Sequence, residues 1–165
     1  MNPIGWVCLQ DPDIRYTKTM SIAARRLQRR AASGGLLYSS PSTGSYSNGA
    51  TVTVQIRMNS GGTAVNAVQA NLSYPATRLQ FSSINTTGSP FTTTIQNSGG
   101  GGTVQLGVGI LAGSTSGDQL VGTVTFTAIS TGSATVAFTA GSGIARASDS
   151  TDICQNKVGA PYTIT

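Results

Sequence analysis

The acidic side chains of this 165-residue chain limit what chemistry it can perform. There is no Glu and no His, so the commonest general base and one of the two carboxyl types are missing. A hydrolase that uses two carboxylates would need a pair drawn from Asp118, Asp149 and Asp152. These residues lie in "TSGDQL" and "ASDSTDI", which are typical of turns. The many Ser and Thr hydroxyls have no evident activating partner. We therefore expect a protein that is not an enzyme.

Metal sites and a phosphate site can also be assessed from the Asp, Cys and Gly residues of the chain. Asp149 and Asp152 either cap backbone N–H groups of their turn or contribute to a calcium site, because Ca²⁺ takes carboxylate and carbonyl oxygens. Two cysteines without any His argue against a zinc site, and pairing of Cys8 with Cys154 stays open. "SGGGG" at 98–102 precedes no helix, so we expect a flexible bend there and not a phosphate site. No cofactor is expected.

The positive charge of the chain belongs mainly to its first 30 residues. That part has a net charge of +4, and the remainder has +1, so the body lacks the basic patch that nucleic acid requires. We expect residues 1–33 to be a basic, flexible segment and residues 34–165 to be the folded domain. The basic run is not followed by the apolar stretch of a signal peptide, and no stretch of roughly 20 apolar residues suggests a membrane span.

The elements of the body read as short strands. In "ATVTVQIRM" (50–58) apolar and polar residues alternate, which indicates a half-buried antiparallel strand. Turn residues such as Asn48-Gly49 separate this segment from its neighbours. The pattern predicts an all-β antiparallel sandwich of eight or nine short strands. Its other eight candidate strands are 36–40, 64–74, 78–84, 91–96, 102–111, 119–130, 132–140 and 160–165.

The stretch "TAVNAVQANLSYPATRLQF" (63–81) fits two periods. Val65, Val68 and Leu72 have helical spacing, whereas alternation over 68–74 indicates a strand. A strand is favoured, because the stretch lies between a clear strand and Pro75 and its helical face is not continued. The strand interpretation buries Val68, Ala70, Leu72 and Tyr74, and it places Val65, Gln69 and Asn71 on the outer face.

The order of these segments resembles the cohesin domain of bacterial secreted and surface proteins. "NLSYPATRLQF" is similar to the family's strand with its Tyr-Asp-Pro ending, although here Tyr74 is followed directly by Pro75. "GDQLVGTVTFTAISTGSATV" is similar to a later pair of strands. The resemblance covers roughly Leu36 to the C-terminus. It implies a nine-stranded antiparallel jelly-roll sandwich that serves protein–protein attachment, with a dockerin-like module as one candidate partner.

We therefore expect a non-catalytic interaction domain for adhesion or assembly at a bacterial surface or in a polysaccharide-degrading complex. This function implies an extracellular or cell-surface location, although no signal peptide is visible. The partner-binding candidates on the outer face are Ala67, Gln69, Asn71, Gly107 and Gly109. A carbohydrate-binding module using Tyr38 or Tyr46 and a structural spacer remain alternatives, so polysaccharide stays a possible partner.

Overall fold

A computed structural model describes residues 34–165 of the chain. The basic segment 1–33 lies outside this range, and so does Cys8, the cysteine considered as a partner for Cys154. Within the range the chain forms strands, turns and bends only. No helix in this part is long and apolar enough to cross a membrane.

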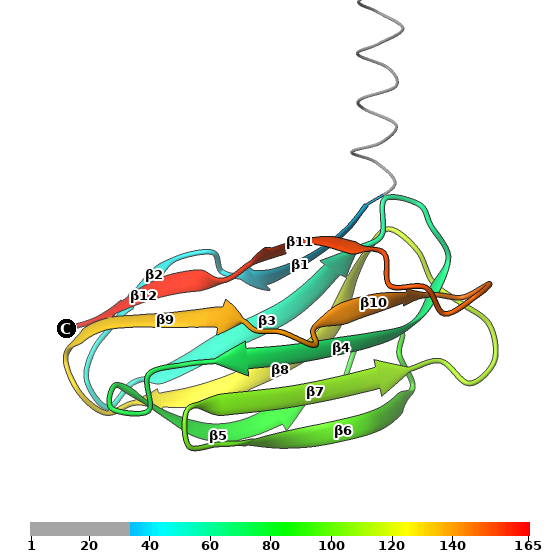
Figure 1. The fold of residues 1–165 in the computed structure, drawn as a ribbon. Helices are drawn as coiled ribbons and strands as arrows, with labels where there is room; N and C mark the ends of the chain where they lie inside the picture. The colour runs from blue at the N-terminus through cyan, green and yellow to red at the C-terminus, as the bar shows by residue number, and fades with distance from the viewer. Residues whose placement is uncertain (1–33) are drawn as a thin grey trace, which may run out of the picture. The chain divides into compact units, whose positions relative to one another are not determined.

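The strands form two sheets that pack as a sandwich (Figure 1). The first sheet has the order β11-β1-β3-β8-β5. Its strands are β1 (Gly35–Ser40), β3 (Thr51–Asn59), β5 (Leu79–Asn85), β8 (Asp118–Ala128) and β11 (Cys154–Val158). The second sheet has the order β2-β12-β9-β4-β7-β6, and β10 also pairs with β4. Its strands are β2 (Gly44–Tyr46), β4 (Val65–Ser73), β6 (Thr93–Gly100), β7 (Thr103–Gly109), β9 (Gly132–Phe138), β10 (Gly143–Arg146) and β12 (Ala160–Ile164).

The all-β sandwich predicted from the sequence is confirmed, but it has twelve strands where nine were expected. Each of the nine expected segments overlaps one strand, and β2, β10 and β11 are additional. These three strands have three to five residues each, and no residue of β2 or β11 is buried, so their sequences show little apolar alternation. The sandwich is also not purely antiparallel, because β1 pairs with β11 and β12 pairs with β2 in parallel. β6 continues to Gly100, so the expected bend at 98–102 is confined to the tight turn that follows.

The core lies between the two sheets and follows the predicted alternation. Val52, Val54, Ile56 and Met58 of β3 are fully buried. Phe126 of β8 is also fully buried, and its ring lies 4.9 Å from that of Tyr74 and 6.4 Å from that of Phe81. The burial of Val68, Ala70, Leu72 and Tyr74 is confirmed. This packing holds β4 firmly, so the opposite face of β4 is presented to solvent in a fixed register.

Val65 departs from the prediction. Its side chain is fully buried and does not lie on the outer face. The reason is a β-bulge, because Ala145 pairs with Ala67 whereas the next residue, Arg146, pairs with Val65, so Asn66 is an extra residue in β4. The bulge shifts the alternation by one position and turns Val65 and Val68 to the same side. The three-residue spacing of these two valines, which resembles helical spacing, is therefore caused by the bulge.

Candidate functional site

The five predicted partner-binding residues lie together on the outer face of the second sheet. β4 and β7 are antiparallel neighbours, and their register places Ala67 opposite Gly109 and Gln69 opposite Gly107. Asn71 is opposite Gln105 in the same register. Figure 1 shows β4, β7 and β6 side by side. Since residues two apart on a strand point to the same face, the register of one strand pair is enough to assemble this surface.

A network of side-chain amides crosses this face. Gln69 Nε2 donates to Asn71 Oδ1 at 2.8 Å and to Gln96 Oε1 at 2.9 Å. Gln96 Nε2 in turn donates to Gln105 Oε1 at 2.7 Å. Asn71 Nδ2 donates to the carbonyl of Ala140 at 3.3 Å. These bonds join three strands and the β9–β10 connection, and they fix which end of each amide faces outward.

Gln96 and Gln105 are the members of this network that the sequence did not reveal. A bulge in β6 brings Gln96 into place, because Thr94 pairs with Val108 and Gln96 pairs with Gly107, which leaves Ile95 as the extra residue. Ile95 and Gln96 consequently both reach the outer face, and the side chain of Ile95 is 69% exposed. Gln105 could have been identified from the alternation of its strand. It lies two residues before Gly107 and therefore points to the same face.

The two predicted glycines contribute space and not contact surface. Gly107 and Gly109 are buried beneath neighbouring side chains. A Cβ at Gly107 would lie 2.6 Å from Gln69 Oε1, and a Cβ at Gly109 would lie 3.3 Å from Ile95 Cδ1. The glycines thus let the side chains of adjacent strands lie flat across β7.

A hollow of about 240 Å³ opens beside this network. Small side chains line its base, where Ala145 of β10 pairs with Ala67 of β4. Ile95 lines it as well, together with Gln69 and Asp152. The remaining lining residues are Val68, Val108, Gly143, Ile144 and Ser150. The hollow therefore combines apolar walls with three side chains that can accept hydrogen bonds, those of Gln69, Ser150 and Asp152.

The two aspartates considered for calcium hold the loop between β10 and β11. Asp152 Oδ1 accepts the N–H groups of Ile144 at 3.0 Å and Cys154 at 2.9 Å. Asp149 Oδ1 accepts the N–H of Thr151, and its Oδ2 pairs with Arg146 Nη1 at 3.2 Å. The Thr151 backbone bond, aided by Arg146, lowers the pKa of Asp149. In residues 34–165 no group of three or more Cys, Asp, Glu or His side chains is arranged to hold a metal ion.

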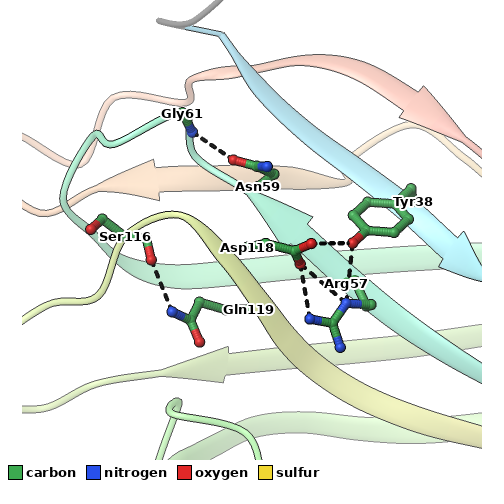
Figure 2. Close-up of polar contacts among 7 residues, drawn as sticks. All are labelled: Tyr38, Arg57, Asn59, Gly61, Ser116, Asp118 and Gln119. Carbon is green, nitrogen blue, oxygen red and sulfur yellow. Dashed lines mark hydrogen bonds and ion pairs between the residues drawn. The ribbon is translucent and has the colours of Figure 1, made fainter.

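Asp118, the third carboxylate of the body, belongs to a cluster on the first sheet (Figure 2). Arg57 Nη2 lies 3.0 Å from Asp118 Oδ1, and the Tyr38 hydroxyl donates to Asp118 Oδ2 at 2.6 Å. Burial, reinforced by the hydrogen bond to Asp118, raises the pKa of Tyr38. A raised pKa keeps the phenol neutral, so this cluster acts as a brace across β1, β3 and β8 and offers no activated nucleophile.

The tyrosines considered for sugar stacking are used in packing. Tyr46 of β2 packs edge-on against Tyr162, with ring centroids 5.8 Å apart. Tyr38 comes from the other sheet and is held by Asp118 and Arg57. The rings of Tyr38 and Tyr46 therefore belong to different sheets and do not build one stacking platform.

Neither a protein-family model nor a curated protein sequence matches this chain. Several solved structures, however, are similar to this chain. The cohesin CaCohA2 from Clostridium acetobutylicum is 18% identical, with a TM-score of 0.65 over 80% of this chain and 91% of that chain. The third cohesin of ScaC from Acetivibrio cellulolyticus, in complex with the ScaB dockerin, is 13% identical, with a TM-score of 0.62 over 79% and 98%.

A third similar structure is the type III cohesin module of the cell-surface anchoring scaffoldin ScaE from Ruminococcus flavefaciens. It is 7% identical, with a TM-score of 0.61 over 81% of this chain and 90% of that chain. Identities this low speak for the fold and not for the partner. The structural similarity agrees with the resemblance seen in the sequence. Residues 34–165 therefore form a domain with the cohesin fold.

Proposed function

We propose that this chain is a non-catalytic interaction module that binds a protein partner through the outer face of β9, β4, β7 and β6. The observation that carries the proposal is the amide network of Gln69, Asn71, Gln96 and Gln105 beside the hollow. A preorganised polar surface next to an apolar depression favours specific recognition, because little side-chain entropy remains to be lost on binding.

A dockerin-like module is the partner class that this proposal favours. One of the similar structures is a cohesin bound to a dockerin, and another belongs to a cell-surface anchoring scaffoldin. By analogy with these proteins, we place the module outside the cell or on its surface, in adhesion or in the assembly of a polysaccharide-degrading complex. The engagement of all three body carboxylates in structural contacts supports a role without catalysis.

The test is a binding assay of the full chain against a panel of purified, calcium-loaded dockerin modules. Gln69→Ala removes both amide bonds that Gln69 donates, and we expect it to weaken binding at least about five-fold, as for residues worth more than 1 kcal/mol. Gln55→Ala is the matched control, since Gln55 is an exposed glutamine on the opposite sheet.

Other outcomes would contradict the proposal. Equal weakening by both variants would move the contact away from this face. Capture by no dockerin, together with saturable binding to cellulose or chitin, would favour the carbohydrate-binding alternative. Binding to neither class would leave the spacer interpretation.

A further inference from the structure

The hollow beside the amide network has an unusual charge environment. Asp152 is the one carboxylate in residues 34–165 that has no cationic partner within that range, since Asp118 pairs with Arg57 and Asp149 pairs with Arg146. Asp152 is exposed and lines the hollow. A negative charge at the edge of an apolar depression favours a cation with an apolar stem.

The free acceptors of the hollow can be identified atom by atom. Asp152 Oδ1 already accepts the N–H groups of Ile144 and Cys154, and no hydrogen bond within the described part of the chain uses Oδ2. Oδ2 lies over Gly143, where an added Cβ would be 2.8 Å away. Gly143 of β10 pairs with Gln69 of β4. The carboxylate of Asp152 therefore lies over the residue directly opposite Gln69.

Gln69 adds a second acceptor. Both N–H groups of its amide are donated, one to Asn71 and one to Gln96. Its Oε1 receives no hydrogen bond from residues 34–165 and is therefore available to a donor. The hollow thus offers acceptors on the side chains of Asp152, Gln69 and Ser150, and apolar surface from Ala67, Ala145 and Ile95.

Resting on the function proposed above, we infer that this hollow receives a lysine side chain presented by the protein partner. The four-carbon stem packs on Ala67, Ala145 and Ile95, and the ammonium group donates to Asp152 Oδ2. The donors of a lysine ammonium are rotatable, so those not used by Asp152 stay available to other acceptors that line the hollow. Arginine fits less well, because its planar fork prefers both oxygens of a carboxylate and Oδ1 is already occupied.

The inference can be tested without knowing the partner. The full chain, labelled with ¹⁵N, is titrated with n-butylammonium as a mimic of the lysine side chain. n-Butylguanidinium and n-butanol serve as mimics of arginine and of an apolar side chain. We expect saturable shifts of the Gly143 and Ala145 amides and of the Gln69 side-chain amide, strongest for the ammonium and reduced by salt.

Asp152→Asn is the decisive variant, because an amide oxygen can still accept the two backbone N–H groups while the charge is lost. We expect it to weaken butylammonium binding about two- to five-fold, the range of an exposed ion pair. Asp149→Asn is the matched control, since that carboxylate belongs to the same loop but is already paired, and it should leave the affinity unchanged.

Several results would overturn the inference. They are no saturation up to the solubility of the amine, equal binding of butanol, tighter binding of the guanidinium, or equal effects of the two Asp variants. A partner whose binding requires Gln69 but tolerates Asp152→Asn would refute the lysine contact and leave the proposed function standing. Conversely, amine binding without any protein partner would separate the hollow from that function.

Discussion

The side-chain oxygen of Gln69 occupies the space above Gly107 that a side chain at that position would need. An added Cβ at Gly107 would lie 2.6 Å from Gln69 Oε1 and 3.2 Å from Gln96 Cβ. The amide network and the glycine therefore depend on each other. Gly107 matters to this surface because it has no side chain, and this relationship can be tested directly.

Gly107→Ala should disturb the surface more than the fold. The nearest atom is the end of a flexible side chain, so Gln69 can swing aside, and we expect the free energy of unfolding to change by less than about 1 kcal/mol. The side-chain amide signals of Gln69 and Gln96 should shift in an NMR spectrum, and partner affinity should fall. Thr103→Ala, at an exposed position of the same strand, is the control. Unshifted amide signals would contradict this account.

Val65→Thr tests the bulge in β4. The two side chains have similar shape, but a threonine hydroxyl at this fully buried position would lack a partner. We expect a loss of about 1–3 kcal/mol in the free energy of unfolding, measured by urea denaturation. Asn66→Thr, at the half-buried neighbouring position, should have a much smaller effect. Equal losses for both variants would mean that Val65 faces solvent after all.

Stability should decline at alkaline pH through Tyr162. Burial, with a contribution from Tyr46, raises the pKa of Tyr162 far above its ordinary value. The folded state therefore favours the neutral phenol. The contribution of Tyr162 to the free energy of unfolding is full below a pH of about 10, where the unfolded phenol is neutral too, and it is lost as the pH rises above that value. Tyr162→Phe should flatten the decline when denaturation is measured between neutral and alkaline pH.

The same variant has a cost at neutral pH, because the hydroxyl of Tyr162 donates to the carbonyl of Pro41 at 2.8 Å. Its loss should lower the free energy of unfolding by about 1 kcal/mol. Tyr38→Phe is the comparison, since Tyr38 is less buried and should alter the alkaline slope less. An unchanged slope in Tyr162→Phe would show that other groups control the decline.

Gly159→Ala should destabilise the fold where β11 leads into β12. A Cβ there would lie 2.3 Å from the carbonyl oxygen of Val136 and 2.9 Å from the Cα of Ala137, and both atoms belong to the backbone of β9. Relief requires strand movement, so we expect a loss of about 1–3 kcal/mol or more on chemical denaturation. Gly109→Ala is the matched variant, because the nearest atom is the movable end of Ile95. Similar stability of the two variants would argue against this packing.

The sequence by itself determined the fold class and part of the candidate partner-binding face. Alternation is a local property, so the burial of Val68, Ala70 and Leu72 could be predicted, and with it the outward position of Gln69 and Asn71. The pairing of β4 with the segment 102–111 could not be predicted from the sequence of either segment alone. The prediction nevertheless placed Gly107 and Gly109 beside it, and the observed register joins them.

Tertiary structure alone decided the features that depend on two strands at once. A bulge exists only relative to a partner strand, so neither the burial of Val65 nor the outward turn of Ile95 could be read from one segment. The hydrogen bond between Gln69 and Gln96 joins residues 27 positions apart, and Asp152 reaches Gly143 only through the pairing of the short strand β10. Periodicity specifies which face a residue occupies, whereas register specifies its neighbours, and register is set by the packing of the whole sandwich.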